Sequence, residues 1–211
     1  MRSRGRFVLL ALAVLLVVLV LAVPAQAATV KKGSSQMTIG ALYVKELAKL
    51  NVIPGPVAPA TMKVKFTSKG QMYYWFRVPM VKRSGNNTST WSPSTGKGTF
   101  YHSGSVRFVE ASATEHKLFR AEGIRIIANS KTSYTMSVSY KPTSGPYMRV
   151  SLATSTHAPK ITHSGKSYRI DGLQFKLTQA GHDAIESVLG AGESFDMTKT
   201  IFATNLLPVL Q

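Results

Sequence analysis

The chain contains no cysteine, and only 9 of its 211 residues are acidic, against 26 lysines and arginines. Without cysteine it can form no disulfide, no thiolate nucleophile and no cysteine-based zinc site, a composition that suits bacterial export better than a disulfide-stapled extracellular module. The stability of the domain must therefore come from its core. About 184 residues remain after the N-terminal segment described next, enough for one sizeable hydrophobic core.

Long apolar runs are also scarce, and the one present lies at the N-terminus. Arg2, Arg4 and Arg6 precede an apolar stretch over 7–23, and Ala25-Gln26-Ala27 follows Pro24. A basic start, a short apolar run and a small-residue cleavage motif are typical of a secretory signal peptide. We predict a signal peptide over 1–27 and a single β-rich domain over 28–211, secreted or displayed at the cell surface. The alternative is an uncleaved anchor, although the run is short for a spanning helix.

The positive charge is large and unevenly distributed. Removal of the three N-terminal arginines lowers the net charge from +17 to +14, and no Asp or Glu occurs between Leu47 and Val109. Such a field attracts anionic cell-wall polymers or a membrane surface. We do not predict specific nucleic-acid binding, because the sequence has neither a recognition helix nor an aromatic RNA-binding signature.

Alternation of apolar and polar residues dominates the domain. Met62, Val64 and Phe66 alternate with lysines, and Leu173, Phe175 and Leu177 show the same period near the C-terminus. Further alternating runs lie at 72–78, 106–108, 118–126, 134–140 and 148–152, most of them bounded by Gly, Ser, Asn or Pro. This pattern predicts a mainly β fold, an antiparallel β-sandwich or barrel-like domain. The polar stretch between Lys82 and Gly98 is predicted to be a surface loop.

Two segments depart from this period and predict short amphipathic helices. In the first, Thr38 is the expected N-cap, Asn51 is the expected stop, and Ile39, Leu42, Tyr43, Leu47 and Leu50 share a face. In the second, Thr178 caps a helix that ends at Leu189 before Gly190.

The sequence contains no recognisable catalytic motif, so we do not predict an enzyme. A Gly-x-Ser-x-Gly elbow and a helical His-Glu-x-x-His motif are both missing. His182, Asp183 and Glu186 lie together on the second predicted helix, where they are expected to form its solvated face. A secreted hydrolase assembled from distant residues remains a third hypothesis, and it requires a carboxylate or hydroxyl near a histidine inside a cleft.

A histidine-containing run lies at the start of one predicted strand, Tyr101-His102-Ser103-Gly104-Ser105-Val106. It resembles the Gly-His-x-Gly-x-Leu strand motif of the HtaA-type haem-uptake domains of secreted and surface proteins of actinobacteria, with Tyr101 in place of the glycine. The run 166–178, which ends in Leu177-Thr178, and the helix that follows it match the closing order of those domains. The Trp-Gly element that opens them has no counterpart here.

This resemblance implies a β-rich, non-catalytic domain that binds haem through a tyrosine on a helix near its start, supported by a histidine. Tyr43 is the only tyrosine on the first predicted helix and His102 is the motif histidine, so both are candidate haem-binding residues. A phenolate ligates ferric iron, and an imidazole tunes it by hydrogen bonding. The ordinary alternatives are a core tyrosine with a bonded hydroxyl and a surface or turn histidine. The second functional hypothesis is a basic cell-envelope protein that contacts anionic wall polymer or membrane.

Overall fold

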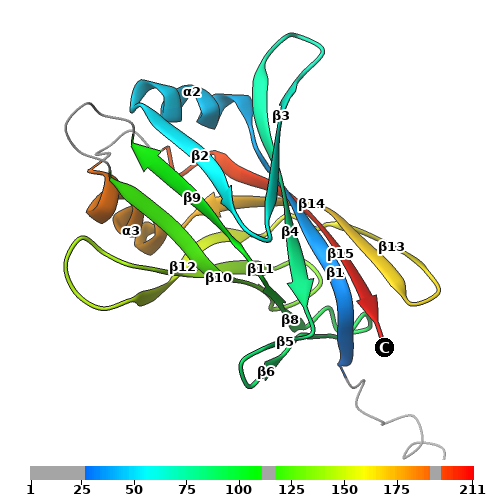
Figure 1. Ribbon diagram of the computed structural model, residues 1–211. Coiled ribbons are helices and arrows are strands. Elements are labelled where there is room, and N and C mark those ends of the chain that lie inside the picture. The colour runs from blue at the N-terminus through cyan, green and yellow to red at the C-terminus, as the bar shows by residue number, and fades with distance from the viewer. Residues whose placement is uncertain (1–26, 111–116, 191–195) are drawn as a thin grey trace, which may run out of the picture.

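The computed structural model describes residues 27–110, 117–190 and 196–211 (Figure 1). The predicted signal peptide over 1–27 lies almost wholly outside the described residues and stays a prediction. The helices are α2 (Ala41–Lys49) and α3 (Gln179–Leu189). The strands are β1 (Ala28–Ile39), β2 (Val52–Val57), β3 (Thr61–Phe66), β4 (Met72–Val81), β5 (Arg83–Ser84), β6 (Asn87–Thr88), β7 (Thr90–Trp91), β8 (Gly98–His102), β9 (Ser105–Glu110), β10 (Leu118–Ala128), β11 (Tyr134–Tyr140), β12 (Met148–Ser155), β13 (Lys160–Ser164), β14 (Ser167–Leu177) and β15 (Thr200–Leu210).

Eight antiparallel strands close into a barrel. Their order around the ring is β1, β4, β8, β10, β11, β12, β14 and β15, and β15 pairs again with β1. Closure means that the ring itself has no first or last strand. The mainly β, antiparallel prediction is confirmed, and of its two forms the structure is the barrel-like one.

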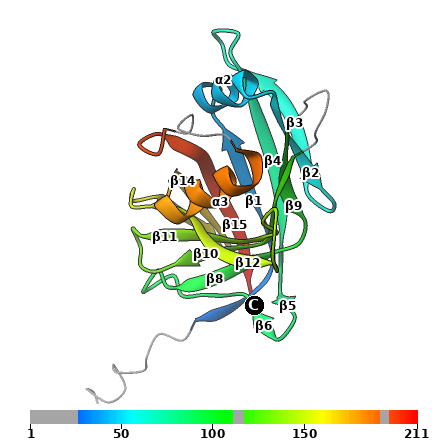
Figure 2. The same ribbon diagram turned by 90° about the vertical axis from the view of Figure 1, so that its left-hand side faces the viewer.

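Further strands extend the barrel wall. β2 and β9 continue from the first half of β10, β3 pairs with the outer edge of β4, and β13 pairs with β14. Figure 2 shows that α2 and the β3–β4 hairpin lie at one end of the barrel, with the short β5–β6 hairpin at the opposite end. The candidate site described below lies at the end that carries α2.

A bend in β10 allows this strand to pair with three others. The register shifts between Glu122 and Arg125, and Gly123 between them has a φ of 52°. The left-handed φ favours glycine at the bend, whereas a Cβ at Gly123 would meet only the flexible end of the Arg149 side chain, at 2.9 Å. Before the bend β10 pairs with β9, and after it with β8.

The barrel interior is filled by residues that alternate along the strands. On β1, Ser35, Met37 and Ile39 are buried, whereas the lysines at 31 and 32 are exposed. Leu173, Phe175 and Leu177 point inward on β14, as their alternation predicts. An eight-stranded barrel of this kind is a packed core rather than a channel.

α3 forms as its sequence predicts. The hydroxyl of Thr178 accepts a hydrogen bond from the backbone N–H of Gly181 at 2.9 Å, and Gly190 ends the helix in the left-handed conformation. Gly181 also packs against β12, where an added Cβ would lie 2.0 Å from the carbonyl oxygen of Leu152. The glycine thus sets the close approach of helix and barrel.

α2 is shorter than predicted. Thr38 and Ile39 complete β1 through hydrogen bonding with β4 and β15, so the helix begins after Gly40, which provides no side-chain cap. The predicted cap at Thr38 is therefore wrong, because strand pairing takes precedence over local capping. The expected stop is confirmed, since Asn51 adopts a left-handed φ of 52°. Leu42 is exposed rather than part of the buried face.

The predicted loop between Lys82 and Gly98 is partly wrong. It contains β5, β6 and β7, and Trp91 within it is fully buried, with its ring 5.1 Å from that of Tyr168. β1, β2, β13 and β15 were also not predicted. Within the described ranges, neither helix is long and apolar enough to cross a membrane.

Candidate functional site: a tyrosine cleft at the helical end

A cleft of about 560 Å³ lies where α2, the β3–β4 turn and the ends of β14 and β15 meet. Gln174 and Lys176 line it from the outer face of β14, because the alternate residues of that strand fill the barrel. Its lining residues are Gly40, Ala41, Leu42, Tyr43, Thr67, Gln71, Gln174, Lys176, Thr198, Lys199 and Thr200. We call it the Tyr43 cleft.

Tyr43 lies on the buried face of α2 and is only 3% exposed. Its hydroxyl donates a hydrogen bond to the backbone carbonyl oxygen of Asp196 at 2.7 Å, which links the helix to the segment before β15. Burial, and secondarily the negative charge of Asp196, raises the pKa of Tyr43 to about 12. The phenol is therefore protonated at neutral pH.

The rim of the Tyr43 cleft is positively charged. Lys199 forms an ion pair with Asp196, with 2.9 Å between the ammonium and a carboxylate oxygen. Hydrogen bonds from Thr198 and Lys199 lower the pKa of Asp196 to about 2. Lys176 lies on the neighbouring strand and is exposed. Lys199 is thus already compensated by Asp196, whereas Lys176 has no ion pair among the described residues. The ammonium group of Lys176 at this opening favours an anionic ligand group.

His102 lies inside the barrel and not at a surface turn. It is 5% exposed, its Nε2 is 2.6 Å from the hydroxyl oxygen of Ser35, and its Nδ1 is 3.2 Å from the carbonyl oxygen of Ile124. Because a carbonyl can only accept, Nδ1 carries the proton and Nε2 accepts from Ser35. Burial lowers the pKa of His102 to about 4, so the imidazole is neutral at physiological pH.

The structure does not bring the two candidate residues together. Both ring nitrogens of His102 have interior partners on β1 and β10, whereas Tyr43 lines a cleft on the outer side of the barrel. The ordinary interpretation of His102 as a surface or turn residue is wrong, because the side chain is buried.

The contact between Ser35 and His102 also bears on the hydrolase hypothesis. A hydroxyl within hydrogen-bond distance of an imidazole is the arrangement that activates a nucleophile. Ser35 is fully buried, however, and neither residue lines the Tyr43 cleft or the second cleft described next. The pair is better explained as a satisfied polar contact in the core.

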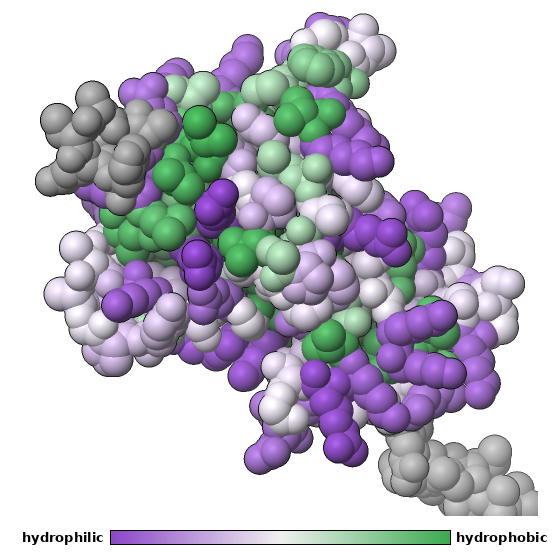
Figure 3. Space-filling view, viewed as in Figure 1, coloured by the Kyte–Doolittle hydropathy of each residue, from purple (hydrophilic) through white to green (hydrophobic). Residues whose placement is uncertain are grey.

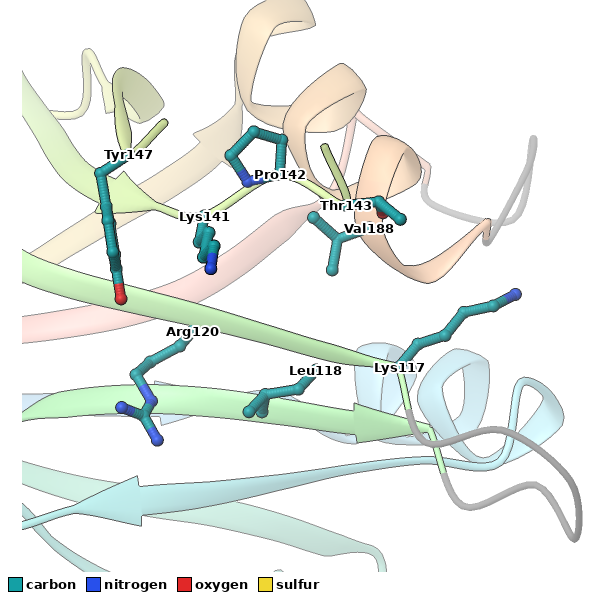
Figure 4. A pocket seen from close by; sticks show the side chains of 8 residues that line it. All are labelled: Lys117, Leu118, Arg120, Lys141, Pro142, Thr143, Tyr147 and Val188. Atoms are coloured by element: carbon teal, nitrogen blue, oxygen red, sulfur yellow. The ribbon is translucent and has the colours of Figure 1, made fainter. Parts of the chain in front are cut away.

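A second cleft, of about 440 Å³, lies between β10, the β11–β12 connection and α3 (Figure 4). Figure 4 shows the side chains of Lys141 and Tyr147 pointing toward β10, and Arg120 on β10 also lines the cleft. Arg120 is paired with Glu122 at 3.1 Å, and Lys117 with Glu110 at 3.6 Å. Two of the three cations that line this cleft are thus already compensated by carboxylates.

An apolar row leads to this second cleft across the outer face of three strands. Ile53, Val109 and Leu118 are paired in register on β2, β9 and β10, and Ile53 and Leu118 are exposed. Figure 3 shows an apolar patch on this side of the molecule.

His182, Asp183 and Glu186 on α3 lie close to one another, as their spacing predicts. Asp183 and Glu186 are exposed, and their carboxylate oxygens lie 3.6 and 3.7 Å from Nδ1 of the partly buried His182. The carboxylates form part of the solvated face of the helix, in agreement with the expectation.

The barrel, with its short helix after the first strand and its capped helix before the last, is an HtaA-like fold. The structure is similar to that of the C-terminal domain of HtaA from Corynebacterium glutamicum, with a TM-score of 0.55 and 14% sequence identity. The similarity covers 87% of this chain and 99% of that domain. No family model matches the sequence, and no curated protein matches it. At this identity the comparison concerns the fold and assigns no site residue.

Sequence reasoning identified Tyr43 but not the residues around it. Thr67, Lys176 and Lys199 come from three segments that are far apart in the chain, and the lysines carry no local motif. The only available signal for Lys176 was its outward position in a strand with clear alternation. Its proximity to α2 depends on barrel closure, which the sequence pattern does not specify.

Proposed function

We propose that residues 28–211 form an exported, non-catalytic binding domain that takes an iron porphyrin into the Tyr43 cleft. The observation that carries this proposal is the position of Tyr43: a tyrosine on the first helix of an HtaA-like barrel, at a cleft with two lysines. The resemblance of the sequence to haem-uptake domains supports the same ligand. The positive charge of the chain favours an acidic ligand as well.

The residues of the cleft fit such a ligand in three respects. A tyrosine oxygen is a suitable ligand for ferric iron. Lys176 supplies a charge that suits one propionate, and Lys199 supplies a second when it exchanges its ion pair with Asp196. Ala41 and Leu42 offer apolar contact beside Tyr43. The cleft volume is also within the range common for small-molecule sites.

Iron binding requires a change at Tyr43. Its hydroxyl must exchange the hydrogen bond to Asp196 and lose its proton, and the raised pKa of Tyr43 opposes that loss. His102 supports the barrel from within in this proposal and does not contact the ligand.

The test is a visible absorption titration of residues 28–211 with hemin. We expect a saturable Soret shift that Tyr43→Phe abolishes and that the double variant Lys176→Ala, Lys199→Ala weakens. Circular dichroism checks that Tyr43→Phe remains folded, as we expect of a substitution that keeps the buried ring and removes the hydroxyl bonded to the carbonyl of Asp196.

The second cleft supplies matched controls. Tyr147→Phe removes the hydroxyl of its tyrosine, and Lys117→Ala with Lys141→Ala removes two of its lysines. We expect these variants to titrate like the unchanged protein. A Soret shift that survives Tyr43→Phe but disappears in Tyr147→Phe would place the ligand in the second cleft and refute the proposal. A flat titration would refute iron-porphyrin binding altogether.

A further inference from the structure

The β3–β4 hairpin projects beyond the helical end of the barrel beside α2 (Figures 1 and 2). β3 pairs only with β4 and forms the end of the sheet path, so its outer edge has no strand partner among the described residues. Nearly every residue of β3 is exposed. An edge of this kind is usually protected by charge or covered by a partner.

One face of the hairpin is apolar. Val64 is paired with Tyr74 and Phe66 with Met72, and Phe76 further along β4 points into the barrel core. The apolar row thus begins in the interior and continues past the barrel end into solvent. At the exposed end of the row, Phe66 is 66% exposed and Val64 is 48% exposed. Burial of such large apolar side chains against a partner would lower the free energy.

The other face of the hairpin is basic and aromatic. Lys63 and Lys65 alternate with the apolar residues, and the ammonium of Lys65 lies 4.8 Å from the centre of the Trp75 ring. Lys69 occupies the turn. Lysine beside tryptophan, with exposed apolar residues nearby, is the composition of the bilayer interface, where indole rings lie at headgroup depth.

α2 adds a further apolar residue to this end. Leu42 is 62% exposed and lines the Tyr43 cleft together with Thr67 from the hairpin turn, so the two elements share one rim. We define the apical surface as the side chains of Leu42, Lys63, Val64, Lys65, Phe66 and Lys69. Figure 3 shows apolar and hydrophilic side chains next to one another on the projecting hairpin.

We propose that the apical surface docks on a bilayer of anionic lipid, with Phe66 inserted among the acyl chains and the three lysines at the headgroups. Charge complementarity favours this partner, because no acidic residue occurs between Leu47 and Val109 and the nearest one on α2, Glu46, is paired with Lys49. Each lysine near an anionic surface strengthens binding about fivefold.

The apolar side chains distinguish a bilayer from an anionic wall polymer. A polymer would be bound by the lysines alone and would leave Phe66 and Val64 in water. A bilayer would contact the apolar face of the hairpin through its acyl chains and the basic face through its headgroups.

Docking would also place the mouth of the Tyr43 cleft at the lipid surface, since Leu42 and Thr67 belong to its rim. An amphipathic ligand could then pass between lipid and cleft without crossing water. The docking proposal does not depend on the identity of that ligand.

The experiment is co-sedimentation of residues 28–211 with vesicles of phosphatidylglycerol and phosphatidylcholine, and with phosphatidylcholine alone. We expect binding to the anionic vesicles only. Phe66→Ser, which keeps the charge, should weaken partition about tenfold or more. The double variant Lys63→Gln, Lys65→Gln should weaken it about 25-fold. Tyr147→Ser and Ile53→Ser remove exposed apolar residues elsewhere and should bind like the unchanged protein.

Insertion has its own readout. In Phe66→Trp the added tryptophan should shift its emission to shorter wavelength on vesicle addition, whereas the added tryptophan in Tyr147→Trp should not. If Phe66→Ser binds as tightly as the unchanged protein, the contact is adsorption of a basic surface and the proposal is wrong. Tyr43→Phe should retain vesicle binding whatever its effect on hemin binding. Each of the two proposals can therefore be refuted without refuting the other.

Discussion

The imidazole of His102 on β8 reaches across β4 to the hydroxyl of Ser35 on β1, with 2.6 Å between Nε2 and Oγ. Together with the bond to the carbonyl of Ile124, this contact ties three strands of the ring together from within. The arrangement requires a neutral imidazole, because a charged ring would be buried without a counterion.

Stability should therefore fall on acidification. The pKa of His102 is about 4 in the folded protein, below its ordinary value of 6.5, so folding disfavours the protonated form. The stabilisation is fully present above pH 6.5 and is lost as pH falls towards 4, by roughly 3 kcal/mol. Urea unfolding between pH 4 and 8 measures it. His102→Gln should flatten the dependence of the unfolding free energy on pH. His157→Gln, at an exposed histidine, should leave that dependence unchanged.

Hemin affinity should rise with pH if Tyr43 provides the ligand. Its pKa of about 12 means that the phenol is protonated before binding, and coordination as a phenolate releases that proton. The apparent association constant should increase about tenfold per pH unit in the neutral range. Titrations at several pH values test this, and a pH-independent affinity would indicate binding without the phenolate.

Gly181→Ala should destabilise the domain although alanine favours helix. The helix preference amounts to about 1 kcal/mol, but the new methyl group would meet the carbonyl oxygen of Leu152 at 2.0 Å. We expect a net loss of about 1–3 kcal/mol from displacement of α3. Denaturant unfolding measures the change. Gly40→Ser has open space and should gain a few tenths of a kcal/mol as a helix cap.

Asn51 should tolerate glycine but not a β-branched residue. Its φ of 52° is in the left-handed region, where a side chain branched at Cβ is strained. Asn51→Val should lower the free energy of unfolding by about 1 kcal/mol, and Asn51→Gly should leave it nearly unchanged. Equal effects of the two substitutions would show that the side chain of Asn51 matters more than its backbone.

The elements predicted from sequence were those with a clear local signal. Phe175 and its neighbours alternate strictly, and Thr178 and Gly190 mark the ends of α3. β1 was not predicted because its interior position at Ser35 is polar and its sequence contains Gly33. β15 contains Pro208, a residue that normally argues against a paired strand.

The candidate site was predictable only in part. Tyr43 could be named from the resemblance, but Lys199 lines the same cleft only because β15 returns to pair with β1. The burial of His102 likewise depends on long-range closure. Periodicity reports which face of a strand is apolar, and it does not report which strands become neighbours.

The pairing of β15 with β1 also fixes when the site can exist. Val30 pairs with Leu210 and Ile39 with Phe202, so the seam joins the most distant described strands. Contacts of such long sequence separation slow folding, because the loop-closure entropy must be paid before they form. Tyr43 follows one strand of the seam and Lys199 precedes the other, so a partly synthesised chain has no Tyr43 cleft. Ligand binding in the Tyr43 cleft would therefore show that β15 has paired with β1.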